Sequence, residues 1–302
     1  MKKLSTLLIA LAASTSLWAT EGALSGRFTI NESGDQIVFS RGNLQYVGTW
    51  QFAEHQWDYF GNSQSDNHRD LFGWGTGDAP NKCDKEADYY IYNNWGANPI
   101  TNGGNVANAW RTLTKDEWIY LLISRTSANI LYAVGTVNVV NGVIFLPDDW
   151  TTPDGLTCNP ANMKPDGGTG YWDMSSHASD NTYTAEQWAA MESAGAVFFP
   201  FAGRRYQTTL FSVGANGHYW SSTIETAVKA WFLRVSDLII DTESDNRYMG
   251  YSVRLVQAVS NGDPTAIDET DAKTKAVKHI VDGQLFIEKN SKTYNAIGVE
   301  VK

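Results

Sequence analysis

Two histidines and three aspartates are grouped in residues 55–70 and could be drawn as a metal site. His55 and His68 flank or adjoin Asp58, Asp66 and Asp70. Protein metal sites commonly use ligands at short fixed spacings, such as His-x-x-x-His on a helix. Neither that spacing nor His-x-His is present here. We therefore predict that these are polar loop residues and expect no metal site among them.

A second group of carboxylates lies in a turn-rich stretch after residue 146. Asp148, Asp149 and Asp154 stand beside Pro147 and Pro153. Oxygen ligands grouped in this way suit Ca²⁺, but the spacing of an EF-hand loop, Asp-x-Asp-x-Asp-Gly, is missing. We predict a solvated acidic turn, and we expect neither a metal nor another cofactor.

Nucleophilic catalysis requires a nucleophile, a base within reach and a group that orients the base. The sequence has no Gly-x-Ser-x-Gly motif, and its Ser, His and Asp residues follow no order that fits a known triad. The two cysteines, Cys83 and Cys158, lack the spacing of a zinc site, and their sequence positions leave open whether they form a disulfide. We predict that the protein is not an enzyme.

Two helices carry the same start signal. Thr114 with Glu117, and Thr184 with Gln187, are capping boxes, in which a cap and the third helical residue satisfy each other's backbone N–H groups. The first helix is expected over residues 115–124 with Trp118, Leu121 and Leu122 buried. The second helix is expected to stop at Gly195.

Short strands fill most of the remaining chain. Alternating or apolar runs predict strands within residues 27–52, around a hairpin turn at Asn141-Gly142, and at 197–201, where Pro200 favours a sheet edge. Further strands are expected at 218–222, at 230–235 and from Tyr251 to Leu255, with a turn-rich charged passage at 237–250. Helices set among short antiparallel strands predict an α+β fold with long loops.

Several motifs in sequence order resemble one family. They are LFGWGTG (71–77), WRTLTKDEWIYLL (110–122), GVIFLPDDW (142–150), GAVFFPFAGRR (195–205), YWSST (219–223) and GYSVRLV (250–256). Together they resemble bacterial C-type-lectin-like domains of the formylglycine-generating-enzyme and Fibrobacter succinogenes major-domain type, which are common in secreted Bacteroidales proteins. The resemblance covers most of residues 24–257 and implies a C-type-lectin-like fold.

The same resemblance narrows the function. Formylglycine-generating enzymes would imply two redox cysteines in the C-terminal half of the domain, but no cysteine follows Cys158. Animal C-type lectins bind sugars through Ca²⁺ with EPN or QPD and WND tripeptides, none of which occurs here. Two well-known activities of the fold therefore lack their residues.

What the resemblance leaves is a binding surface. In diversified relatives, the positions between YWSST and SVRLV form the ligand-binding face. Exposed Trp, Tyr and Arg anchor many interfaces, so we expect a protein or glycan ligand there. Trp231 could be either core or contact. The predicted ligand-binding residues are Trp231, Asp245, Arg247, Tyr248 and Tyr251.

Charge and the two ends of the chain suggest where the protein acts. The chain has 23 basic and 33 acidic side chains, which disfavours a nucleic-acid partner because such binding needs a basic surface. Lys2, Lys3 and the short apolar run that follows predict a signal peptide over residues 1–19, with no membrane span. We expect a secreted or cell-surface protein.

After the predicted signal peptide, the chain is expected to divide into three further parts. Residues 20–258 form the C-type-lectin-like domain, residues 259–276 a polar linker, and residues 277–302 a small β segment. That segment resembles the sorting signals of type IX secretion, although an ordinary β-hairpin tail is the alternative. The expected function is non-catalytic ligand binding. The alternatives are a glycan-processing enzyme that uses loop carboxylates, or a structural adhesin subunit.

Overall fold

The computed structural model describes residues 21–82, 92–160 and 180–259, and the strand backbones within residues 277–301. The chain divides into two compact units, the first ending at Val259 and the second comprising residues 260–302. The predicted signal peptide, Cys83 and all of the predicted linker except Val259 lie outside the described residues. Among the residues that are described, no helix has both the length and the hydropathy needed to cross a membrane.

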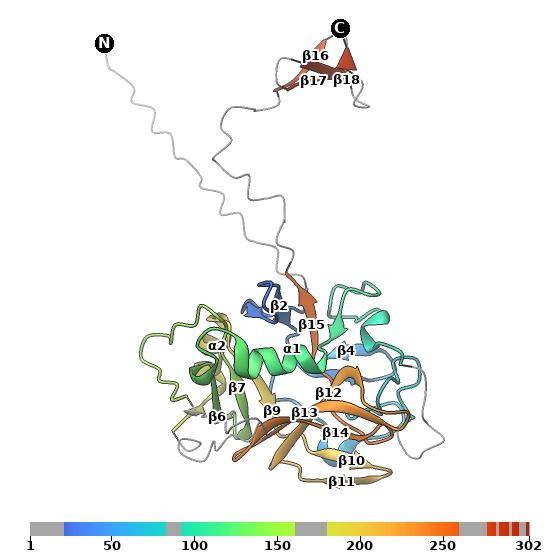
Figure 1. The fold of residues 1–302 in the computed structure, drawn as a ribbon, viewed down its shortest axis with the longest axis vertical. Helices are drawn as coiled ribbons and strands as arrows, with labels where there is room; N and C mark the ends of the chain where they lie inside the picture. The colour runs from blue at the N-terminus through green and yellow to red at the C-terminus, as the bar shows by residue number, and fades with distance from the viewer. Residues whose placement is uncertain are drawn as a thin grey trace, which may run out of the picture. The chain divides into compact units, whose positions relative to one another are not determined.

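The first unit is an α+β fold, as predicted, in which two helices lie among small, mostly antiparallel sheets (Figure 1). One four-stranded sheet has the order β1-β2-β15-β5 and another the order β8-β6-β7-β9, while β12, β13 and β14 form a three-stranded sheet. Two hairpins, β3-β4 and β10-β11, complete the unit. The strands are β1 (Phe28–Thr29), β2 (Gln36–Phe39), β3 (Leu44–Tyr46), β4 (Trp50–Phe52), β5 (Arg111–Thr112), β6 (Tyr132–Val137), β7 (Val140–Phe145), β8 (Thr182–Tyr183), β9 (Val197–Pro200), β10 (Arg204–Tyr206), β11 (Thr209–Phe211), β12 (Asn216–Ile224), β13 (Lys229–Ser236), β14 (Ile240–Asn246) and β15 (Leu255–Ala258).

The second unit is a small antiparallel sheet of order β16-β17-β18-β19. All four of its strands lie within residues 277–302, the segment for which a β structure was predicted. The four strands are β16 (Val277–Val281), β17 (Gln284–Lys289), β18 (Lys292–Asn295) and β19 (Glu300–Val301).

The first helix begins and packs as predicted. α1 (Lys115–Ile119) continues as a π-helical turn, η4 (Tyr120–Ser124). Thr114 Oγ1 accepts a hydrogen bond of 3.2 Å from the Glu117 N–H, and Glu117 Oε2 accepts one of 2.7 Å from the Thr114 N–H. Trp118 and the two leucines of the turn are buried. α1 packs against β12, β13 and β14 and lies beside them in Figure 1.

The second helix, α2 (Ala185–Ser193), has the same cap and stops where predicted. Thr184 Oγ1 accepts a hydrogen bond of 3.2 Å from the Gln187 N–H, and Gln187 Oε1 accepts one of 2.9 Å from the Thr184 N–H. Gly195 follows the helix with φ of 96°, a conformation in which a side chain is strained.

Replacing Thr184 with alanine should lower the free energy of unfolding by about 1 kcal/mol, because it leaves the Gln187 N–H without its acceptor. Urea unfolding followed by tryptophan fluorescence measures the change. Thr208→Ala is the matched control, since Thr208 is exposed in the turn between β10 and β11 and should change stability by less than about 0.5 kcal/mol. Equal effects of the two substitutions would contradict the capping role.

The hairpin predicted at Asn141-Gly142 turns three residues earlier, so that prediction is wrong. β6 and β7 are joined at Asn138 and Val139, which have φ of 45° and 63°, and Gly142 lies within β7 opposite Gly135. Gly142 is needed there for a different reason. A Cβ atom at this position would come within 2.4 Å of the Phe198 ring on the neighbouring strand β9.

The charged passage 237–250 contains a strand that the sequence analysis missed. Residues 240–246 form β14, which pairs with β13 along its whole length. Conversely, the strand predicted from Tyr251 to Leu255 begins only at Leu255, and Ser252 and Arg254 are buried where the alternation suggested exposure. Pro200 does end β9 at a sheet edge, as predicted.

The interior consists of three hydrophobic clusters. One lies between α1 and the sheets and includes Phe39, Trp118 and Leu233. A second includes Trp74, Trp220 and Tyr251, and a third packs α2 against β6, β7 and β9. β12 and β13 contribute to the first two clusters with opposite faces, so the three-stranded sheet is fixed from both sides.

Candidate functional site

The three-stranded sheet carries a row of acidic side chains along one face of β14. Successive strand residues point to opposite faces, so Asp241, Glu243 and Asp245 share a face. The register places Asp241 beside Arg234 of β13. Because β14 is an edge strand of this sheet, the row lies at the sheet's border.

Arg234 binds two members of this row. Its Nε and Nη2 atoms lie 3.1 and 2.8 Å from the two carboxylate oxygens of Asp241, and Nη2 also lies 2.9 Å from Glu243 Oε1. Burial is the main cause that raises the pKa of Asp241, and Arg234 opposes it. Burial also raises the pKa of Glu243, again opposed first by Arg234. One guanidinium group thus contacts both carboxylates at once.

Asp245 is held by a buried tyrosine and a second arginine. Its Oδ2 atom accepts a hydrogen bond of 2.6 Å from the Tyr251 hydroxyl and lies 3.9 Å from Arg204 Nη1. Tyr251 is fully buried, packed against Trp220 and Phe232, and burial raises its pKa. The prediction that Tyr251 touches a ligand is therefore wrong, and its role is to position Asp245.

The β10-β11 hairpin extends this face with exposed aromatic groups. Tyr206 is 38% exposed and Phe211 41%. Arg204 pairs with Phe211 across the hairpin, and its guanidinium lies 5.9 Å from the centre of that ring. Arg205 points the other way and is buried, as strand alternation requires.

Residues 247 and 248 join the hairpin to the end of β14. The Tyr248 ring lies 5.7 Å from the Tyr206 ring. The Arg247 guanidinium lies 5.3 Å from the Trp74 ring and donates a hydrogen bond to the Ala227 carbonyl. Both residues are half-buried. We call the set Arg204, Tyr206, Phe211, Arg234, Glu243, Asp245, Arg247 and Tyr248 the β10–β14 surface.

Trp231 does not belong to this surface. The register pairs it with Ser244, on the face that carries Leu233 and packs against α1. Its half-buried ring lies 3.8 Å from Lys115 Nζ. The structure therefore does not bring Trp231 to Asp245, because the two side chains stand on opposite faces of one sheet, and a ligand contact of Trp231 stays a prediction.

No protein-family model, curated protein or solved structure matches the chain.

The acidic groups noted in the sequence have mainly structural partners. Asp148 Oδ2 accepts hydrogen bonds of 2.7 Å from the N–H and hydroxyl groups of Thr29, and Oδ1 lies 3.3 Å from Arg125 Nη1. His55 Nδ1 lies 3.0 Å from Asp58, and the His68 ring stacks on Phe60. Within the described ranges, no three His, Cys, Asp or Glu side chains are placed to hold a metal ion.

Sequence reasoning missed five of the eight residues of the β10–β14 surface. Arg204, Tyr206 and Phe211 lie outside the window between YWSST and SVRLV, and only the fold brings them to it. A local signal did exist for Glu243. In the run Ile-Asp-Thr-Glu-Ser-Asp-Asn, acidic residues alternate with Thr and Ser, the period of a strand with one charged face.

Proposed function

We propose that the first unit is a secreted or cell-surface, non-catalytic binding domain of the C-type-lectin-like type. It holds a protein or glycan ligand on the β10–β14 surface. One observation carries this proposal: the exposed rings of Tyr206 and Phe211 lie on the same face as the ion pair between Arg204 and Asp245. Aromatic and arginine side chains in such a setting provide anchoring area and directed hydrogen bonds.

Further observations support the proposed fold and the proposed location of the protein. Two helices with capping boxes among short strands are what a C-type-lectin-like domain requires, and six motifs resemble that family in order. The predicted signal peptide supports export. The β segment at the C-terminus supports display on the cell surface, which also fits the alternative of an adhesin subunit.

A glycan-processing enzyme is the less favoured alternative. Glycosidases need one carboxylic acid and one free carboxylate on either side of the scissile bond. Asp241 and Glu243 are close enough for such a pair, because both contact Arg234 Nη2. Arg234 Nη2, however, lies 2.8 Å from Asp241 and 2.9 Å from Glu243 and so occupies the space between the two carboxyl groups. This arrangement favours binding over acid–base catalysis.

Replacing Phe211 or Tyr206 with alanine should weaken ligand binding by about tenfold or more, since exposed aromatic anchors in interfaces commonly contribute over 1 kcal/mol. The ligand is first captured with the full mature chain on glycan arrays and in cell-surface pull-downs, and affinities are then measured by calorimetry. Arg247→Ala and Tyr248→Ala should also weaken binding. Arg247→Ala additionally removes its contacts to Trp74 and Ala227, so its stability must be measured in parallel.

Ile130→Ala is the matched control, because Ile130 is an apolar side chain of similar exposure, 47%, outside the β10–β14 surface. Its affinity should equal that of the unaltered chain. If Phe211→Ala and Tyr206→Ala retain full affinity for the captured ligand, the surface is assigned wrongly.

A further inference from the structure

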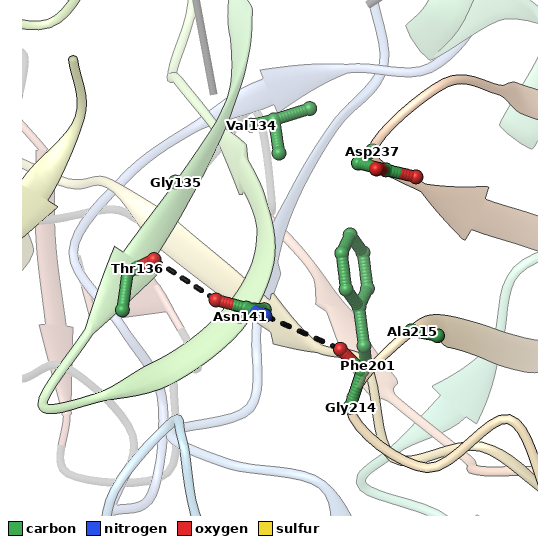
Figure 2. A pocket seen from close by; sticks show the side chains of 8 residues that line it. All are labelled: Val134, Gly135, Thr136, Asn141, Phe201, Gly214, Ala215 and Asp237. Carbon is green, nitrogen blue, oxygen red and sulfur yellow. Dashed lines mark hydrogen bonds between the residues drawn. The ribbon is translucent and has the colours of Figure 1, made fainter. Parts of the chain in front are cut away.

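A pocket of about 370 Å³ lies between the β6-β7 hairpin and the strands that build the β10–β14 surface. Figure 2 shows Thr136 and Asn141 of the hairpin on one side of the hollow, Asp237 and Ala215 on the other, and the Phe201 ring between them. Asp237 directly follows β13, and Ala215 directly precedes β12. The pocket thus borders the strands of the proposed binding surface.

The floor of the pocket is apolar and its rim is exposed. Val134 and Phe201 line the bottom and are almost completely buried, at 5% and 2% exposure. Gly135 and Gly214 add backbone without side chains. Asn141, Ala215 and Asp237 at the rim are exposed. An occupant therefore needs an apolar stem and a polar end.

The hydrogen-bonding groups of the pocket determine which kind of polar end an occupant must have. The N–H groups of Thr136, Phe201 and Gly214 all donate to backbone carbonyls, so they are not free to bind an anion. The Thr136 hydroxyl donates to Asn141 Oδ1 at 3.0 Å, and Asn141 Nδ2 donates to the Gly214 carbonyl at 3.3 Å. What remains at the rim is mostly acceptor capacity, above all the Asp237 carboxylate.

The Asp237 carboxylate stands at the mouth of the pocket. Within the described parts of the chain, no ion pair or hydrogen bond to this carboxylate is present. The whole chain is also acidic, with a formal charge of −10. An exposed carboxylate above an apolar floor complements a side chain that has methylene groups and a terminal cation.

We propose that this pocket receives a lysine or arginine side chain of a protein partner. The methylene stem lies on Val134 and Phe201, and the ammonium or guanidinium group binds Asp237, with the Thr136 and Asn141 oxygens as further acceptors. This inference rests on the proposed binding function and deepens it, because it identifies the partner as a protein with an exposed basic residue next to the β10–β14 surface.

The test titrates the full chain with Nα-acetyl-lysine amide and Nα-acetyl-arginine amide, and follows the amide signals of residues 134–141 and 214–215 by NMR. The neutral probe Nα-acetyl-norleucine amide and simple methyl glycosides form the other arms. The basic probes should bind at this site, and Asp237→Asn should weaken them by about tenfold, as expected for loss of a charge-assisted hydrogen bond. Ala215→Leu, which fills the mouth from an exposed position, should also prevent binding.

Asp149→Asn is the matched control, because Asp149 is an exposed aspartate away from the pocket lining, and this variant should bind the basic probes normally. Binding of methyl glycosides but not of basic probes would overturn the inference in favour of a sugar site, and so would equal binding of the norleucine probe. Absence of all binding would overturn it as well. Phe211→Ala tests the β10–β14 surface separately, so a failure of the pocket alone leaves the proposed function standing.

Discussion

Replacing Arg254 with alanine is expected to lower the free energy of unfolding by about 3–5 kcal/mol, the largest effect of any single substitution considered for this protein. Arg254 is only 1% exposed. Its Nη2 atom lies 3.0 Å from Gln56 Oε1, and Nη1 lies 3.3 Å from Asn43 Oδ1 and 3.4 Å from the Phe198 carbonyl. The substitution leaves these buried acceptors with fewer donors and opens a cavity.

The position of Arg254 explains why the cost is high. Its partners come from the segment before β3, from the loop after β4 and from β9, which are far apart in sequence. Gln56 in turn donates a hydrogen bond of 2.8 Å to Glu192 at the end of α2. Burial lowers the pKa of Arg254 to about 10, which still leaves it charged at neutral pH. The cation therefore joins four segments through one network.

Urea unfolding of the purified chain measures the effect. Arg41→Ala is the control, since Arg41 is exposed and makes a single hydrogen bond to the Glu54 carbonyl, and it should change stability by less than about 0.5 kcal/mol. Arg254→Lys keeps the charge but not the planar guanidinium group, so its loss in the free energy of unfolding should lie between those of Arg254→Ala and Arg41→Ala. A loss below about 1 kcal/mol for Arg254→Ala would show that the network is not what joins these segments.

Arg254 also illustrates what the sequence could not predict. Tyr251, Val253 and Leu255 alternate with Ser252 and Arg254, which is the pattern of a half-buried strand. In the structure all five are buried, because this segment runs between two hydrophobic clusters. Periodicity reports one buried face. It cannot report that a second layer covers the other face.

Features that depend on neighbouring residues were predicted best. Both capping boxes involve residues three apart, so Thr114 and Thr184 located the helix starts correctly. The prediction of a turn at Asn141-Gly142 was wrong because Gly142 is needed to leave room for the ring of Phe198, which lies more than fifty residues away in sequence. The same limit applies to the site. Asp245, Arg247 and Tyr248 were found within one window, whereas Arg204, Tyr206 and Phe211 reach it only through long-range pairing of β10 and β11 with this region.

The last prediction concerns pH and two buried groups whose effects oppose each other. Burial raises the pKa of Asp70 to about 6, and the favourable interactions with the Phe60 N–H and with His68 only partly offset it. Burial, followed by the charge of Arg204, lowers the pKa of His218 to about 4. Both side chains lie in the interior, at 2% and 4% exposure. Each therefore makes stability depend on pH between about 4 and 7.

The sign of each contribution to stability depends on whether the folded or the unfolded chain binds the proton more tightly. Folded Asp70 binds it more tightly than the unfolded chain, whose pKa is near the ordinary value of 3.8, so its contribution increases stability as pH falls through 6. Folded His218 binds it less tightly than the unfolded chain, with an ordinary pKa of 6.5, so its contribution is lost as pH falls from 6.5 towards 4. Each amounts to about 3 kcal/mol at most, and in the unaltered chain the two largely cancel.

Replacing either Asp70 or His218 should reveal the pH dependence of stability that the other contributes. Asp70→Asn keeps an oxygen that can accept the 2.6 Å hydrogen bond from the Phe60 N–H, but it cannot titrate, so this variant should lose about 2–3 kcal/mol of stability between pH 7 and pH 4.5 relative to the unaltered chain. His218→Gln should instead gain stability relative to the unaltered chain over the same range. Urea unfolding at half-unit pH steps measures both slopes, and the double variant should have nearly the slope of the unaltered chain, because the two removed contributions oppose each other. If the two single variants show the same slope, then Asp70 and His218 do not titrate in the interior as the structure requires, because only opposite pKa shifts produce opposite slopes.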